Sequence, residues 1–229
     1  MIKSWRGGCC RPLCLVASVT RCPISVYFMP AQRDMGHYKD TRSIYHEKQS
    51  QMLCALHALN NVLQDKIFSK SSLDDIASNL APSKFVNPHR NFFGLGNYDA
   101  NVLVLALQQC NYDIVWCDKR KSVRDHNLNF NNILGFILNT LSRRRVFSFN
   151  LPYAGSHWIA FRHITVNGTG RYYNLDSKLR APVSVASTDE EFINYLERRL
   201  REYPDTQLLF VVSKDVLQQR SWTRNSPVS

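Results

Sequence analysis

Residues 44–63 read IYHEKQSQMLCALHALNNVL, and the regular patterns of the chain begin in this segment. Five aliphatic residues recur there at helical spacing and predict a helix over residues 53–65 that begins at Cys54 or just before it: Leu53, Leu56, Leu59, Val62 and Leu63. The first turn of a helix stabilises a thiolate, because its free N–H groups carry partial positive charge. Cys54 is therefore a candidate nucleophile.

Helical patterns come first along the chain and strand patterns come second. Ser71 or Ser72 is expected to cap a second helix with Asp74 and Asp75 in its first turn, and Asp99 is expected to cap a third. Short β-branched and aromatic runs then predict strands at 112–117, 134–139, 158–164, 171–175 and 208–212, with a helix around 189–201. This segregation indicates an α+β domain with an antiparallel sheet.

One histidine and one acid are predicted to meet across a hairpin. His157 stands at the front of a predicted strand, after a Gly-Ser pair, so we expect an exposed ring at a sheet edge. Asn167-Gly168 predicts a tight turn into the next strand, in a register where residue 161 faces residue 174. Asp176 then lies diagonal to His157, within reach of its ring. Asn174 remains the reserve partner, because sequence alone does not fix the register.

These residues together indicate acyl transfer by a thiol. His157 would take the proton from Cys54, and Asp176 would hold the imidazole in the required tautomer. Gln49, five residues before the nucleophile, is placed to donate to the oxyanion beside the Cys54 N–H. Trp158 would shield the His–Asp hydrogen bond from water.

Other chemistries find less support in the sequence. The remaining histidines show no metal-ligand spacing, and His57, on the same predicted helix as Cys54, is expected to be structural. We expect no metal and no cofactor. The basic runs 119–121 and 143–145 lack interleaved aromatic residues, so nucleic acid is not an expected partner. No apolar run reaches the about 18 residues that a transmembrane helix requires.

Residues 1–43 form a basic, cysteine-containing extension that we expect to be disordered. They contain seven Lys/Arg and two Asp, and thus carry +5 of the formal net charge of +11. Alternatives for this segment are a targeting peptide, palmitoylation with membrane association, or zinc binding through its four cysteines, Cys9, Cys10, Cys14 and Cys22. The rest of the chain has only Cys54, Cys110 and Cys117, which is typical of a reducing compartment.

The runs 44–49 and 53–61 closely resemble the opening of Josephin domains. The similarity continues at 87–89, 96–99, 157–158 and 172–179. It implies a papain-like cysteine protease fold of the Josephin type over residues 44–222, with a helical part packed against an antiparallel sheet and a short tail at 223–229. The chain is most similar to the short Josephin-only proteins, because no room remains for ubiquitin-interacting helices or a glutamine tract.

The resemblance also implies an activity, a partner and a set of site residues. The family's members are deubiquitinases, which are thiol proteases that hydrolyse the bond after ubiquitin's C-terminal glycine through a thioester. Its oxyanion glutamine, nucleophile, histidine and third member fall on Gln49, Cys54, His157 and Asp176. A monomer that acts on ubiquitin and ubiquitinated proteins in the cytoplasm and nucleus is expected. The alternative is a catalytically weak or latent ubiquitin-binding module.

Overall fold

The computed structural model describes residues 44–50, 52–81, 98–146 and 149–224, which belong to one compact unit. Its helices are α1 (Cys54–Leu63), α2 (Lys70–Leu80), α3 (Ala100–Gln109), α4 (Asp189–Glu202) and α5 (Lys214–Gln219). Its strands are β1 (Tyr112–Trp116), β2 (Ile133–Val146), β3 (Phe149–Val166), β4 (Thr169–Asn174), β5 (Val183–Ala186) and β6 (Gln207–Ser213). The predicted extension 1–43 and most of the predicted tail 223–229 lie outside the described residues, as do residues 51, 82–97 and 147–148.

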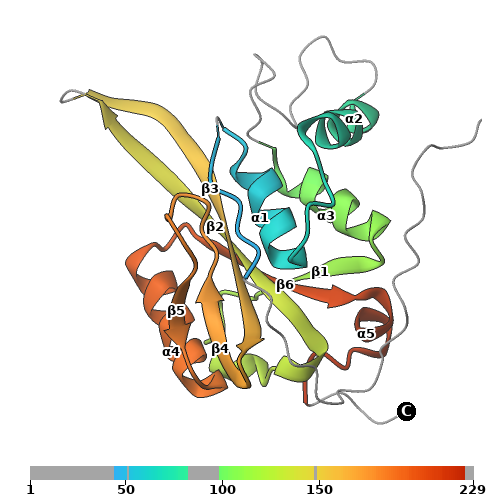
Figure 1. Ribbon diagram of the computed structural model, residues 1–229. Helices are drawn as coiled ribbons and strands as arrows, with labels where there is room; N and C mark the ends of the chain where they lie inside the picture. Colours follow the sequence, from blue (N-terminus) through green and yellow to red (C-terminus); the bar gives the residue numbers. More distant parts are fainter. Residues whose placement is uncertain (1–43, 51, 82–97, 147–148, 225–229) are drawn as a thin grey trace, which may run out of the picture. The chain divides into compact units, whose positions relative to one another are not determined.

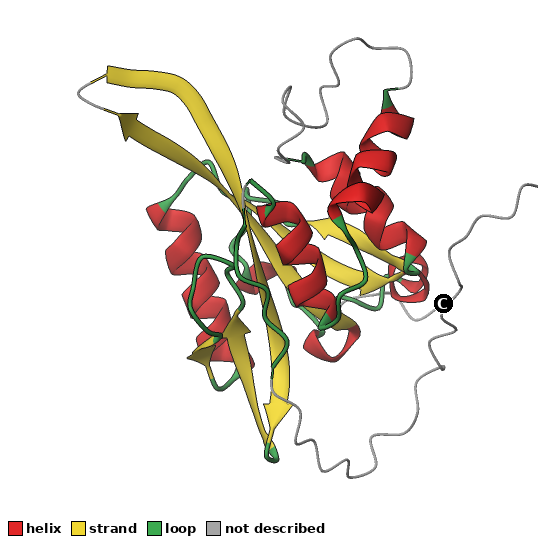
Figure 2. Cartoon of the chain, turned by 45° about the horizontal axis from the view of Figure 1, so that its top comes forward, coloured by secondary structure: helices red, strands yellow, loops and turns green. Residues whose placement is uncertain are grey.

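A six-stranded sheet in the order β1-β6-β2-β3-β4-β5 forms the centre of this unit, and each neighbouring pair is antiparallel. Helices α1, α2 and α3 lie on one side of the sheet and α4 lies on the other (Figures 1 and 2). Because successive side chains of a strand point to opposite faces, Trp158 and Ala160 join the core under α1 to α3, whereas Ile159 and Phe161 join the core under α4. The predicted α+β class with an antiparallel sheet is confirmed.

The start of α2 differs from the prediction. Ser69 is the N-cap, and Ser72 is the third residue of the helix, where the two serines cap one another reciprocally. Asp74 therefore lies beyond the first turn, where it pairs with Lys70 at 2.6 Å. Three serines lie close together in the sequence, and each satisfies the same local capping signal, so the pattern could not distinguish them. Asp99 caps α3 as predicted.

Strand β3 is longer than predicted, and this changes the environment of His157. The strand begins at Phe149, and His157 pairs with Thr140 of β2, whereas the pairing of β3 with β4 begins only at Phe161. His157 therefore lies where β3 pairs on one side, as expected near a sheet edge, but it is only 6% exposed, so the expectation of an exposed ring was wrong. The strand continues through Gly155 and Ser156 because its ladder with β2 is made by backbone groups, which need no β-forming side chain.

The turn between β3 and β4 has the predicted register. Asn167 and Gly168 both have positive φ, 50° and 78°, as a two-residue hairpin turn requires. Phe161 pairs with Asn174, and this is the predicted alignment. Beyond Asn174 the chain continues along β3, where the Leu175 N–H donates to the carbonyl of Ala160 at 2.8 Å and Asp176 reaches His157. Strand β5 and helix α5 were not predicted from the sequence.

Candidate active site

The thiol of Cys54 lies at the amino end of α1. Leu53 occupies the N-cap position, and its side chain has no acceptor for the N–H groups of the first turn. The N–H groups of the first turn, which carry partial positive charge, are therefore not capped by the side chain of the N-cap residue at the end of the helix where Cys54 lies. Cys54 Sγ lies 3.7 Å from the carbonyl oxygen of Ser156, 102 residues further along the chain. This contact brings α1 against the strand that carries His157.

The imidazole of His157 lies between the thiol and an acid. Its Nε2 is 2.7 Å from Asp176 Oδ1, and the two side chains are 7% and 15% exposed. Burial lowers the pKa of His157, but the hydrogen bonds to Asp176 and Cys54 and the charges of both groups outweigh burial and raise it above its ordinary value. Because Nε2 is bonded to the acid, Nδ1 is the ring nitrogen that remains for the thiol.

Asp176 is held by the loop that follows β4. Its Oδ1 accepts the Lys178 N–H at 2.9 Å as well as the imidazole, and its own N–H donates to Asn174 Oδ1 at 2.9 Å. Burial raises the pKa of Asp176, yet the bonds from His157 and Lys178 lower it below its ordinary value. Asn174 thus contacts Asp176 through its side chain, and it is Asp176 that reaches His157.

Gln49 and Trp158 take different places around this group. Gln49 is half-buried, and its N–H donates to the carbonyl of Ser177 at 2.7 Å, so its backbone adjoins the loop of Asp176. The indole of Trp158 is 1% exposed and donates to the carbonyl of Tyr98 at 3.0 Å. The shielding role of Trp158 remains a prediction.

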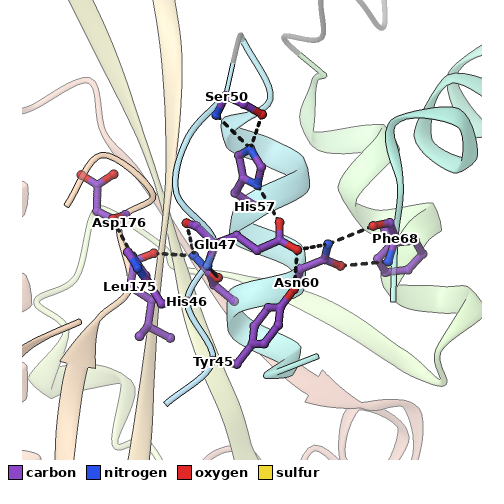
Figure 3. Close-up of polar contacts among 10 residues, drawn as sticks. Tyr45, His46, Glu47, Ser50, His57, Asn60, Phe68, Leu175 and Asp176 are labelled. Carbon is purple, nitrogen blue, oxygen red and sulfur yellow. Dashed lines mark hydrogen bonds and ion pairs between the residues drawn. The ribbon is translucent and has the colours of Figure 1, made fainter. Parts of the chain in front are cut away.

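A buried polar cluster beside α1 was not predicted. Glu47 contacts His57, Asn60 and Tyr45 through its carboxylate (Figure 3). The signal that could have found it is the Asn60-Asn61 pair, since two amides on a helix with buried residues all round need polar partners. His57 was expected to be structural, and its contact with Glu47 accords with that expectation.

The other two free thiols of the described chain have environments that disfavour catalysis. Cys117 Sγ lies 3.4 Å from His126 Nε2, but burial, together with the charge of Asp118, raises the pKa of Cys117 to about 11. Burial also raises the pKa of Cys110. A raised pKa keeps a thiol protonated and unreactive at neutral pH. Cys54 is therefore the best placed of the three described thiols, Cys54, Cys110 and Cys117.

The described ranges contain no group of three or more His, Cys, Asp or Glu side chains that could hold a metal ion. Among the helices of the same residues, none is long and apolar enough to cross a membrane.

Comparison with known proteins gives a consistent set of matches. The Josephin family model matches residues 49–206. A "Josephin-like protein" of Drosophila melanogaster is 44% identical over 184 residues, which cover 77% of this chain and 79% of the relative. "Josephin-2" of Homo sapiens is 41% identical over 182 residues, covering 80% of this chain and 93% of the relative. A "Josephin-like protein" of Arabidopsis thaliana is 36% identical over 69% of this chain and 44% of its own length.

Proposed function

This chain belongs to the Josephin family, and on that premise we propose that it is a deubiquitinase, a cysteine-type hydrolase that cleaves the bond after the C-terminal glycine of ubiquitin. The observation that carries the proposal is the 2.7 Å contact between His157 and Asp176, next to a cysteine at the start of a helix. A thiol, a base and a group that orients the base are the parts that nucleophilic acyl transfer requires.

The first half of the reaction forms a thioester. His157 takes the proton of Cys54 through Nδ1, and the thiolate attacks the carbonyl carbon of ubiquitin's last glycine. The Cys54 N–H and the side-chain amide of Gln49 donate to the oxyanion that develops. The imidazolium then protonates the departing amine, and the bond between glycine and amine breaks to leave ubiquitin attached to the sulfur.

The second half releases ubiquitin by the same groups. His157 takes a proton from a water molecule, and the resulting hydroxide attacks the thioester carbonyl. The carbon–sulfur bond breaks, the thiolate recovers a proton from the imidazolium, and ubiquitin leaves with a free carboxylate. Asp176 stabilises the imidazolium in both halves, and its own position is supported by the Lys178 N–H and by Asn174.

The remaining assignments follow from the same family membership. We propose a catalytic domain over residues 44–222, preceded by a basic, cysteine-containing extension at 1–43 and followed by a short tail at 223–229. Ubiquitin and ubiquitinated proteins are the proposed partners of a monomeric enzyme. Three free thiols in the described chain suit the reducing cytoplasm and nucleus.

The experiment is turnover of ubiquitin that carries a C-terminal fluorogenic amide. Wild type should release the fluorophore, and Cys54→Ala should abolish release. Cys110→Ala is the matched control, because Cys110 lies at the far end of α3 and should be dispensable. If the wild-type protein binds ubiquitin but does not release the fluorophore, the alternative of a latent binding module is favoured. The observation behind this alternative is that Cys54 is only 4% exposed, which limits access of a substrate to the thiol.

A further inference from the structure

We propose that Glu47 and His57 are positioning residues, which hold residues 45–50 against α1 and so place the Gln49 amide for the oxyanion. The inference rests on the proposed function and adds two residues to it. Neither residue touches the reacting atoms, since both act through the segment that carries Gln49.

The carboxylate of Glu47 is the centre of the contacts (Figure 3). Its Oε2 lies 2.6 Å from His57 Nδ1, and its Oε1 accepts from Asn60 Nδ2 at 3.0 Å and from the hydroxyl of Tyr45. The N–H of Glu47 donates to Asn61 Oδ1 at 2.7 Å. The side chains of Glu47 and His57 are 16% and 8% exposed. Three donors converge on one carboxylate, as a charged group withdrawn from water requires.

The ring of His57 links the two ends of the segment around Gln49. Its Nδ1–H donates to Glu47, and its Nε2 accepts the backbone N–H of Ser50 at 3.3 Å (Figure 3). Residues 47 and 50 are thus tied to the same side chain of α1, with Gln49 between them. The hydroxyl of Ser50 also lies 3.5 Å from Nε2. Ser50, His57 and Glu47 are thus arranged like a Ser-His-acid triad. However, the lone pair of His57 Nε2 already accepts the nearer backbone N–H of Ser50, so His57 holds the segment in place and does not act as a base.

The same segment is tied to the acid side of the site. His46 Nε2 lies 3.0 Å from the carbonyl oxygen of Asp176, and the Gln49 N–H donates to the carbonyl of Ser177. Residues 45–50 therefore bridge the helix of the nucleophile and the loop of the acid. A shift of this bridge would move Gln49 relative to Cys54.

The pair needs a carboxylate at position 47. In Glu47→Gln the amide retains one oxygen, which can accept from Asn60, but its NH₂ end would face the Nδ1–H of His57. The imidazole could avoid this clash of two donors only by adopting its other tautomer, but the Nε2–H of that tautomer would face the N–H of Ser50. Either choice sets two donors against each other, so residues 47–50 must move away from α1.

The test compares two reactions of the same thiol in the full-length protein. Alkylation of Cys54 by iodoacetamide, followed by mass spectrometry of its peptide, needs the thiolate but no oxyanion donor. Hydrolysis of the ubiquitin fluorogenic substrate needs both. Glu47→Gln should lower kcat by about 10- to 100-fold, as expected for a misplaced catalytic group, with KM and the alkylation rate unchanged.

A double-mutant cycle identifies Gln49 as the group through which Glu47 acts. Gln49→Ala should lower kcat by about 10²- to 10³-fold, and adding Glu47→Gln should lower it no further. His57→Gln removes the same link from the helix side and serves if Glu47→Gln does not fold.

Tyr172→Phe is the matched control, because it removes a hydrogen bond to a carboxylate, Asp189, on the opposite face of the sheet. It should lower stability and leave kcat unchanged.

Two results would overturn the inference while the proposed function stands. One is an alkylation rate that falls in proportion to kcat, and the other is a double mutant whose losses simply multiply. Either would show that the cluster only maintains the fold. A wild-type protein with no turnover would instead overturn the proposed function, and this inference with it.

Discussion

Replacement of Asp176 by asparagine or by alanine separates the charge of this residue from its hydrogen bond. Asparagine retains Oδ1, which can still accept from His157 Nε2–H and from the Lys178 N–H, but it has no charge. Hydrogen bonds to charged groups contribute about 1.5–3 kcal/mol and those between neutral groups about 0.5–1.5 kcal/mol. The charge of Asp176 is therefore worth about 1–1.5 kcal/mol. Its loss in Asp176→Asn should lower the pKa of His157 by about one unit and kcat/KM by about 5- to 10-fold. Alanine removes the acceptor as well and should cost about 10- to 150-fold.

The pH profile gives the sign of the effect. The contact with Asp176 helps to raise the pKa of His157, so loss of the charge lets the imidazolium deprotonate at lower pH. The alkaline limb of kcat/KM for Asp176→Asn should therefore move down by about one pH unit. The assay is the rate on the ubiquitin fluorogenic substrate between pH 5 and 10. An unchanged alkaline limb with a large loss of rate in both variants would refute the electrostatic reasoning.

The same pair should also make the stability of the protein depend on pH. The raised pKa of His157 contributes stability that is complete below about pH 6.5 and is lost as pH rises through the folded pKa. The lowered pKa of Asp176 contributes stability that is present above about pH 3.9 and is lost as pH falls through the folded pKa. The difference in unfolding free energy between wild type and Asp176→Asn should thus be largest between about pH 4 and 6.5.

Two further predictions concern the scaffold. Phe192→Ala should lower the free energy of unfolding by about 3–5 kcal/mol, because the ring is fully buried and stacks on Tyr172 with centroids 4.2 Å apart. Urea denaturation measures this free energy, and a loss below about 1 kcal/mol would contradict the packing. Gly168→Ala should cost about 1–2 kcal/mol from backbone strain at φ 78°, because no heavy atom beyond the two neighbouring residues lies within 4 Å of an added Cβ. Gly168→Asn should cost less, because asparagine tolerates this conformation, and equal losses would place the strain elsewhere.

The features predicted correctly from the sequence are those set by short-range interactions. Helix α1 follows from its apolar spacing, and the cap of α3 follows from Asp99 alone. The register of the β3–β4 hairpin was predictable because a two-residue turn at Asn167 and Gly168 leaves the strands little freedom in pairing. From that register came the expectation that His157 and Asp176 lie close together, and they are in contact.

Apart from the start of α2, two of the missed features, the burial of His157 and the Glu47 cluster, depend on contacts between distant segments. The burial of His157 arises because β2 extends far enough to pair with residues that have no strand pattern of their own. Glu47 lies in a segment without regular structure, and its partners on α1 become apparent only when that segment lies against the helix. Such pairings are fixed by tertiary packing, and a local signal such as the Asn60-Asn61 pair indicates that polar partners are needed without identifying them.

The most direct measurement of the central claim uses ubiquitin whose C-terminus carries a thiol-reactive group. The adduct formed with full-length protein would be digested and its attachment point located by mass spectrometry. We predict one covalent ubiquitin per chain, attached to Cys54, and a strong loss of labelling in His157→Ala. Attachment at Cys110 or Cys117, or no adduct in a folded wild-type protein that binds ubiquitin, would contradict the assignment of Cys54 as the nucleophile.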